Sequence, residues 1–246
     1  MKTNTIIYLL LFTMISFKSM VGQITQKEPD FYNWFDDKVN RFNTGLFNGL
    51  EYIEQYRTIN NRYKFFKSSE FQTGSIVYDG QFYDKVLLKY DLNTDELLFN
   101  VGYNYPYPTL ILFKSKVKSF KLGESDFVHI AMGEGNNQMS GFYELLLVGD
   151  PITLLKKNKK KRFKRIKGNT VYYEFGQDDE YFIKLKGEYH EIKTKKDINR
   201  LMPDKKEFID NYFNPALKKY NQDTFWSSFF NKLADTFISE KVREDL

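Results

Sequence analysis

The stretch of residues 74–99 limits the possible folds of this chain more than any other part. Asp79-Gly80 lies between two runs that are rich in β-branched and aromatic residues. Asp-Gly supplies the two positive-φ positions of a type I′ turn, whose twist matches that of two antiparallel strands. The sequence therefore predicts a tight hairpin in which Tyr78 pairs with Gln81.

The second strand of this hairpin should have one buried face, because successive side chains of a strand point to opposite sides. With a two-residue loop, Phe82, Val86, Leu88 and Tyr90 share a face with Val77. We expect this face to lie in the core and the other face to be wetter. The wetter face carries Tyr83, Lys85, Leu87, Lys89 and Asp91.

Residues 91–95, Asp-Leu-Asn-Thr-Asp, predict a second turn, because Asn and Asp side chains bond nearby backbone and tolerate left-handed geometry. Leu97 and Phe99 begin a third strand, so the three strands form a meander. The same turn resembles the first half of a calcium-binding loop. Glu96 stands where that loop needs glycine, and Gly102 where it needs glutamate, so we prefer a hairpin turn.

More short strands follow, and the last third of the chain changes to helical spacing. The predicted strands are 109–113, 117–122, 126–131, 141–148, one starting at 153, 171–175, 181–185 and 189–192. Residues 195–202 predict a helix, Asp204 a helix cap, and Asp223 the cap of a final helix. In that helix Trp226, Phe229, Phe230, Leu233 and Phe237 form one apolar stripe.

These patterns predict an α+β fold with a curved antiparallel sheet or a partly open β-barrel. An amphipathic helix is expected over residues 30–43, with Phe31, Trp34 and Phe35 on its apolar side. The expected organisation is a β-rich domain with flanking helices over 23–213, followed by an aromatic amphipathic helix over 214–246. The sequence leaves open whether this last helix packs on the domain or is held out for another chain.

The N-terminus has the layout of a signal peptide over residues 1–22. Lys2 precedes an apolar run from Ile6 to Phe17, and small residues precede Gln23, the expected first residue after cleavage. An uncleaved anchor is the alternative, although the run is shorter than the ~20 residues of a spanning helix. After residue 22 no segment predicts a transmembrane span. We therefore expect an exported protein, in the periplasm or outside the cell.

The sequence contains few residues suited to catalysis or metal binding. It has no cysteine, and its two histidines, His129 and His190, have no partner at metal-ligand spacing. It contains neither a G-x-S-x-G motif nor a phosphate-binding glycine loop. Adjacent acids such as Asp178 and Asp179 do not reveal whether two carboxyls face each other across a cleft. We expect no cofactor and no metal.

The most function-like feature is a basic run between residues 156 and 167. Such a run on an exported protein can contact anionic lipid or acidic polysaccharide. The alternative is a solvated hairpin whose lysines only face water. A nucleic-acid partner is disfavoured by the predicted export and by a net charge of only +5. The candidate binding residues are Lys157, Lys159, Lys160, Lys161, Arg162, Lys164 and Arg165.

A recurring pattern is formed by Phe47-Asn48-Gly49-Leu50-Glu51-Tyr52, the hairpin from Gly74 to Tyr83, and the strand from Val86 to Asp91. Gly141-Phe142-Tyr143-Glu144 and residues 181–206 continue it. These segments, which cover most of residues 45–213, resemble a family of exported proteins of Bacteroidota whose function is unknown. The resemblance implies export and a β-rich fold, and it brings no catalytic residues.

Taken together, the patterns predict a non-catalytic exported protein that acts by ligand binding or by cell-envelope interaction. Its partner would be anionic lipid, polysaccharide or another envelope protein, and a lipocalin-like cup is one version of the ligand-binding hypothesis. The alternative is a hydrolase of envelope polymers that works through carboxylates that the sequence does not identify.

Overall fold

The computed structural model describes residues 45–100, 108–133 and 139–244. The chain divides into two units, Met1–Asn40 and Arg41–Leu246, and all described residues belong to the second. The predicted signal peptide over residues 1–22 and the predicted helix over residues 30–43 lie outside the described residues.

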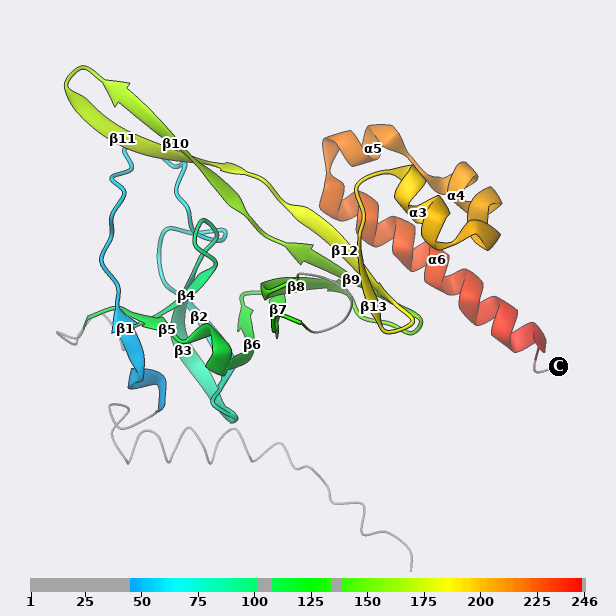
Figure 1. Ribbon diagram of the computed structural model, residues 1–246, viewed down its shortest axis with the longest axis horizontal. Coiled ribbons are helices and arrows are strands. Elements are labelled where there is room, and N and C mark those ends of the chain that lie inside the picture. The colour runs from blue at the N-terminus through cyan, green and yellow to red at the C-terminus, as the bar shows by residue number, and fades with distance from the viewer. Residues whose placement is uncertain (1–44, 101–107, 134–138, 245–246) are drawn as a thin grey trace, which may run out of the picture. The chain divides into compact units, whose positions relative to one another are not determined.

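The described part is rich in strands, and its helices come last (Figure 1). The strands are β1 (Gly49–Glu51), β2 (Gln72–Tyr78), β3 (Gln81–Asp91), β4 (Glu96–Asn100), β5 (Leu110–Leu112), β6 (Val117–Leu122), β7 (Ser125–Ile130), β8 (Gly141–Leu147), β9 (Ile152–Lys157), β10 (Lys160–Lys167), β11 (Thr170–Gln177), β12 (Glu180–Leu185) and β13 (Glu188–Glu191). The α-helices are α3 (Lys195–Leu201), α4 (Lys206–Tyr212), α5 (Pro215–Tyr220) and α6 (Gln222–Glu244), and short 3-10 turns cover Gly45–Phe47, Lys114–Lys116 and Pro203–Lys205.

Eleven strands form one antiparallel sheet in the order β1-β5-β4-β3-β2-β6-β7-β8-β9-β12-β13. Most neighbours in the sheet are also neighbours in the chain, which is the predicted meander. The sheet is not closed, since β1 and β13 are its two edges. This confirms the large antiparallel sheet and the C-terminal helices. No helix among the described residues is long and apolar enough to cross a bilayer.

The hairpin of β2 and β3 has the predicted turn. Asp79 and Gly80 have φ values of 52° and 81°, and Tyr78 pairs with Gln81. The predicted buried face is wrong near the turn, because Phe82 is 39% exposed whereas Tyr83 is buried.

A bulge in β3 explains this exchange of faces. Ile76 pairs with Tyr83, but Gly74 pairs with Val86, so β3 carries one extra residue between these two pairs. Lys85, at the bulge, has a φ of 52°. One extra residue inverts the alternation of side chains. The predicted face is therefore correct only after the bulge, where Leu88 and Tyr90 are buried.

We expect Gly80→Val to lower the free energy of unfolding by about 1–3 kcal/mol, because a β-branched residue resists positive φ. A Cβ atom at Gly80 meets no atom within 4 Å, so the change tests backbone strain without a clash. Urea unfolding followed by circular dichroism measures the effect. Gly80→Asn is the control and should cost clearly less, since Asn tolerates this conformation. Equal losses in both variants would contradict the turn assignment.

The second turn is built around Asp91. Its Oδ1 accepts hydrogen bonds from the backbone N–H groups of Asn93 (2.9 Å) and Thr94 (3.3 Å), and Asp95 has a φ of 59°. The Oδ2 atom of Asp91 pairs with the buried Lys64 at 2.9 Å. The carboxylate thus holds a hairpin turn between β3 and β4, as predicted.

Aromatic side chains fill the core on one side of β2–β8. The ring centroid of Tyr90 lies 5.4–5.7 Å from the centroids of Phe120, Phe127 and Phe142. Phe120 and Phe127 are stacked with their centroids 4.5 Å apart, and Phe66 meets Phe127 edge to face. This side of the sheet is therefore filled by side chains of the protein itself.

The C-terminal helices begin partly where the sequence predicts. Thr194 caps α3 through a reciprocal pair of hydrogen bonds with Asp197. The predicted cap at Asp204 is wrong, because this residue lies in a 3-10 turn and α4 begins at Lys206 without a side-chain cap.

The predicted cap at Asp223 is also wrong. Asn221 takes this role, since its Oδ1 accepts a hydrogen bond from the backbone N–H of Thr224 at 3.0 Å. A cap two residues earlier frees the Asp223 carboxylate for the polar contacts described below.

The final helix packs on the sheet, which answers the question that the sequence left open. The aromatic stripe of α6 shares one apolar core with β9 and β12. Figure 1 shows α6 running beside these strands, with α3, α4 and α5 on the other side of the helix. The buried members of this core from α6 are Phe225, Trp226, Phe229, Phe230 and Leu233.

Candidate functional site

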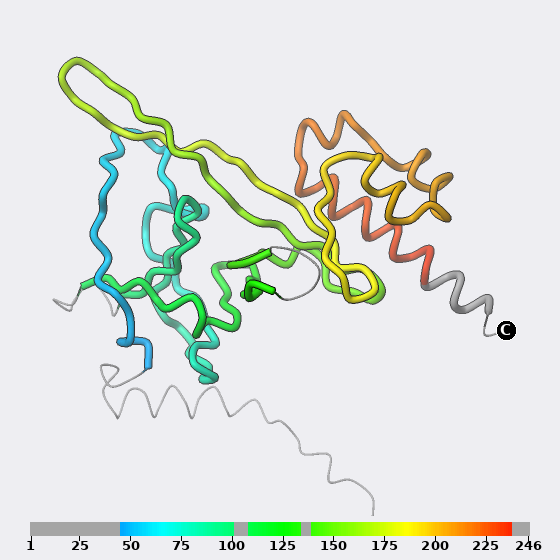
Figure 2. Tube along the Cα trace, viewed as in Figure 1, coloured from blue at the N-terminus to red at the C-terminus, as the bar shows by residue number. Residues whose placement is uncertain are grey.

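The basic run belongs to one long hairpin. Lys157 of β9 pairs with Glu180 of β12, and three residues further Lys160 of β10 pairs with Gln177 of β11. The register is therefore continuous through all four strands. The inner half, β9 and β12, lies in the main sheet, whereas β10 and β11 pair only with each other. We call β10–β11 the outer hairpin; Figure 2 shows the chain running out along β10 and back along β11.

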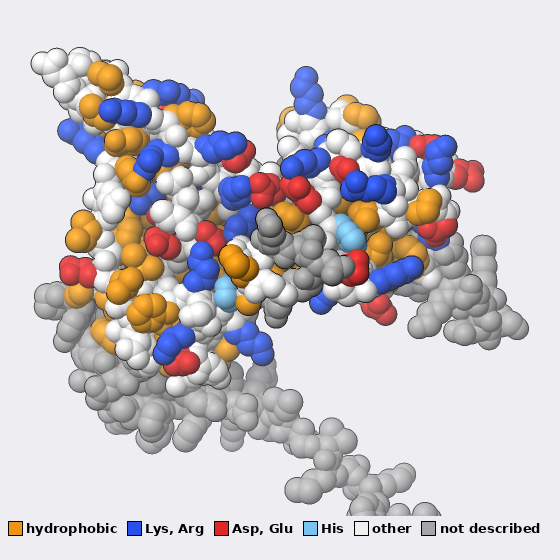
Figure 3. Space-filling view, viewed as in Figure 1, with side chains coloured by type: hydrophobic (Ala, Val, Ile, Leu, Met, Phe, Trp, Pro, Cys, Tyr) orange, Lys and Arg blue, Asp and Glu red, His pale blue; other side chains and the backbone are white. Residues whose placement is uncertain are grey.

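The tip of the outer hairpin is a two-residue loop. Lys167 pairs with Thr170, and Gly168 has a φ of 58°, as a type II′ turn requires at its first central position. The outer hairpin carries six basic residues and one acid, Glu174, which gives a local charge of +5. Figure 3 shows basic and apolar side chains side by side over this hairpin.

Residues 56–62 brace the half of the outer hairpin that is nearer to the sheet. The backbone N–H groups of Tyr173 and Phe175 donate to the carbonyls of Arg57 (2.9 Å) and Arg62 (3.0 Å). The ring of Tyr56 meets the ring of Tyr173 with centroids 5.1 Å apart. Among the described residues, no hydrogen bond or ring contact of this kind braces the tip, residues 166–171.

Lys157 has to be removed from the candidate binding residues, because it is only 8% exposed. Its Nζ lies 2.7 Å from Oδ1 of Asp95 and donates to the carbonyl of Phe142 at 3.1 Å. Burial lowers the pKa of Lys157, and the Asp95 carboxylate offsets part of that effect. A Cβ atom at Gly141 would lie 2.6 Å from this Nζ, so the backbone closes over it.

The next three lysines also contact groups of the protein, although the side chain of Lys161 stays 67% exposed. Lys159 pairs with Glu180 at 2.7 Å, and Lys161 pairs with Asp178 at 2.9 Å. Lys160 donates to the backbone carbonyls of Tyr63 (2.8 Å) and Phe65 (3.0 Å), and burial lowers its pKa. These contacts fix the base of the outer hairpin to the sheet.

The cations nearer the tip are more available. Arg162 lies over the ring of Tyr56, 4.2 Å from its centroid, and Arg165 pairs with Glu174 at 3.1 Å. Lys164 and Lys167 are exposed and form no ion pair among the described residues. Lys167 was not among the predicted binding residues, although it belongs to the same basic run.

Exposed apolar side chains accompany these cations. Ile166 is 71% exposed and Val171 is 41% exposed, and the two residues form the cross-strand pair beside the turn. Phe163 is also exposed. Paired apolar side chains at a projecting tip are unusual for a surface that faces only water. Charge alone does not identify these apolar residues, although Ile166 and Val171 flank the turn in the sequence.

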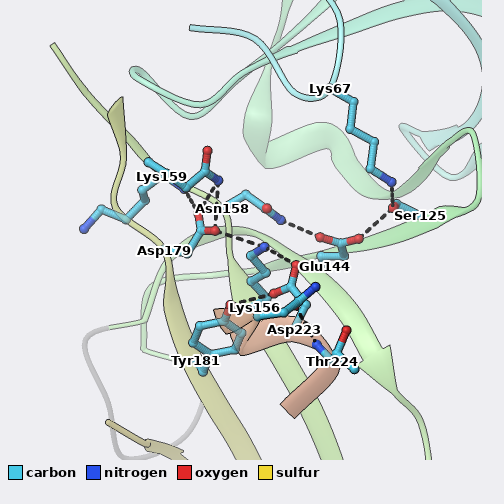
Figure 4. A network of polar contacts seen from close by, with 12 residues as sticks. Lys67, Ser125, Glu144, Lys156, Asn158, Lys159, Asp179, Tyr181, Asp223 and Thr224 are labelled. Carbon is cyan, nitrogen blue, oxygen red and sulfur yellow. Dashed lines mark hydrogen bonds and ion pairs between the residues drawn. The ribbon is translucent and has the colours of Figure 1, made fainter. Parts of the chain in front are cut away.

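Polar residues form a network around the buried Lys156 and the half-exposed Asp223, where the long hairpin meets α6 (Figure 4). The Nζ of Lys156 lies 2.9 Å from Asp179 and 2.8 Å from Asp223, and the hydroxyl of Tyr181 donates to Asp223 at 2.5 Å. Burial alone would lower the pKa of Lys156, but the two carboxylates outweigh it and raise that pKa. Both carboxylates are thus committed to one internal ammonium.

A second chain of hydrogen bonds runs through Ser125. Its Oγ accepts from the Nζ of Lys67 at 2.9 Å and donates to Glu144 at 2.6 Å, whose other oxygen accepts from Asn158 at 2.7 Å (Figure 4). A Ser–Lys pair can act in hydrolysis when the lysine accepts the serine proton. Here the ammonium donates to the hydroxyl and Ser125 is buried, so these contacts tie β7, β8 and the long hairpin together.

The described residues contain no group of three or more His, Asp or Glu side chains that could hold a metal ion. His190 lies near Glu188, at 3.8 Å, and the ring of His129 lies 5.5 Å from that of Phe142. Both histidines are thus in contact with neighbouring side chains of the fold.

Comparison of the chain with protein-family models found no match, and searches of curated proteins and of solved structures found none either.

Proposed function

We propose that this protein is an exported, non-catalytic protein that binds an anionic lipid surface through its outer hairpin. The observation that carries the proposal is the tip, where exposed Ile166 and Val171 form a pair next to the exposed cations Lys164 and Lys167. Export rests on the layout of the first 22 residues.

Lipid fits this tip better than polysaccharide does. Lysines attract an anionic membrane at about 1 kcal/mol each, and the boundary between headgroups and acyl chains accepts apolar side chains. An acidic polysaccharide would satisfy the lysines but would leave Ile166 and Val171 in water. The bracing by residues 56–62 also supports the proposal, because it holds the tip away from the main sheet.

The polar networks support a non-catalytic role. Asp179 and Asp223 share the Lys156 ammonium, and both oxygens of Glu144 accept hydrogen bonds. A glycosidase needs two carboxyls that face a substrate across a cleft. The hydrolase alternative therefore has no specific observation in its favour.

Flotation with vesicles of phosphatidylglycerol tests the proposal. We expect Lys164→Gln with Lys167→Gln to weaken binding about 30-fold, because two contributions of about 1 kcal/mol are lost. Ile166→Ser should weaken binding further, and wild-type protein should bind neutral phosphatidylcholine vesicles far more weakly. Lys118→Gln with Lys186→Gln is the matched control, since it removes two exposed lysines elsewhere.

Three results would overturn the proposal. One is equal vesicle binding by the wild type and the Lys164/Lys167 variant. Another is equal binding to charged and neutral vesicles. The third is binding to polygalacturonate without binding to vesicles, which would assign the hairpin to acidic polysaccharide.

A further inference from the structure

A shallow cavity of about 330 Å³, wide open to solvent, lies among the C-terminal helices, remote in the chain from the outer hairpin. Its wall combines the start of α3, residues from the start and the last turn of α5, and the first residue of α6. The lining includes Thr194, Lys195, Phe213, Lys218, Lys219 and Gln222. This size lies at the lower end of the range for small-molecule sites.

The charge of this cavity has one sign. Three lysines line it, and none of the lining residues is acidic. Lys195 pairs with Asp210 at 2.8 Å. Lys218 and Lys219 have no carboxylate partner among the described residues. A hollow lined by charge of one sign concentrates its field on a ligand of opposite charge.

Lys218 is held in place at this wall. Its Nζ donates to the backbone carbonyl of Lys193 and lies over the ring of Trp226, 5.4 Å from the centroid. These contacts reduce the side-chain entropy that an ammonium loses when it binds a ligand. They leave its full positive charge uncompensated, because neither partner is anionic.

An aromatic ring forms the apolar part of the wall. Phe213 lines the cavity, and its centroid lies 5.0 Å from that of Phe225 and 6.1 Å from that of Trp226. Phe225 and Trp226 are buried, so Phe213 rests on a fixed layer. Gln222, also at the wall, can hydrogen-bond to a polar group of a ligand.

We propose that this cavity is a binding site for an organic phosphomonoester. A phosphoryl group carries nearly two negative charges and three acceptor oxygens, which match Lys218 and Lys219. The body of the ester would lie against Phe213. The phosphoryl group can belong to a soluble ester or to a lipid headgroup. The site is independent of the outer hairpin, with which it shares no residue.

Isothermal titration with phenyl phosphate tests the site, and tryptophan emission, measured in a Trp34→Phe background, reports on Trp226 beside Lys218. We expect phenyl phosphate to bind more tightly than inorganic phosphate, because only the ester contacts Phe213. Lys218→Gln with Lys219→Gln should lower the affinity about ten-fold or more. The matched control is Lys206→Gln with Lys232→Gln, which removes two exposed lysines from α4 and α6 and should change the affinity less than about two-fold. Melting curves check that each variant is folded.

Vesicles of phosphatidic acid separate the two sources of the phosphoryl group when they are tested in the Lys164→Gln, Lys167→Gln background, in which the outer hairpin is neutralised. If adding Lys218→Gln and Lys219→Gln abolishes phenyl phosphate binding but leaves the remaining vesicle binding unchanged, the ligand is a soluble ester. If the added substitutions abolish both, the ligand is a lipid headgroup.

Two outcomes would overturn the proposed site. They are the absence of saturable binding of phenyl phosphate by the wild type, and equal affinity in the wild type and the Lys218/Lys219 variant. Neither outcome bears on the hairpin, whose own test uses Lys164 and Lys167.

Discussion

Trp226→Ala should lower the free energy of unfolding by about 3–5 kcal/mol, the range for removing a large aromatic side chain from a core. Trp226 has no exposed surface and lies between the rings of Phe225 and Phe230, with centroids 4.7 Å and 5.8 Å away. It also contacts Tyr181 of β12, so its removal opens a cavity where helix and sheet meet. The free energy of unfolding of an ordinary domain is about 5–15 kcal/mol, so this loss is a large part of it.

Trp226→Phe is the control that separates packing from hydrogen bonding. The Nε1 atom of Trp226 is buried and has no hydrogen-bond partner among the described residues. Replacing the indole removes an unsatisfied donor, which offsets part of the cost of the smaller ring. We therefore expect Trp226→Phe to lie within about 1 kcal/mol of the wild type in urea unfolding. Equal losses in the phenylalanine and alanine variants would contradict this expectation, because a phenyl ring would then recover none of the lost packing.

Lys157→Met should cost about 3 kcal/mol of stability and leave vesicle binding unchanged. Removing one partner of a buried ion pair leaves the other charge without its compensation. Asp95 would keep the hydroxyl of Tyr90 at 2.6 Å and Lys114 at 2.7 Å, which places the expected loss at the low end of the known range. Urea unfolding and vesicle flotation on the same sample measure both quantities.

Lys164→Met is the matched variant from the same basic run. Its side chain is exposed, so we expect a change in stability within about 0.5 kcal/mol and a clear loss of vesicle binding. Lys157→Met should therefore lower stability without changing vesicle binding, and Lys164→Met should lower vesicle binding without changing stability. If Lys157→Met weakened vesicle binding without a loss of stability, the internal role of Lys157 would be wrong.

The sequence identified the main sheet well, because strand periodicity and turn chemistry are local. The turn at Asp79-Gly80, the Asx turn at Asp91 and the meander agree with the structure. The exposure of Phe82 could not be predicted, because nothing in the sequence around Lys85 distinguishes a bulge from regular strand. One extra residue in β3 exchanged the buried and exposed faces of the strand between the bulge and the turn.

The candidate site was predicted only in part. The sequence indicated a basic hairpin, and the outer hairpin has that form. Its continuous register with β9 and β12, and its bracing by residues 56–62, depend on contacts between distant parts of the chain. The role of Asp223 also depends on a distant residue. Asn221 caps α6, and the Asp223 carboxylate instead forms an ion pair with Lys156 of β9.

The sequence by itself determined the turns, the strand order of the meander and the apolar stripe of the last helix. Each depends on backbone preference or on the spacing of a few neighbouring residues. Only the tertiary structure decided that Lys157 is buried against Asp95 while Lys164 remains exposed, although both belong to one basic run. Burial and ion pairing depend on what lies opposite a side chain in space, and the spacing of lysines along a strand does not contain that information.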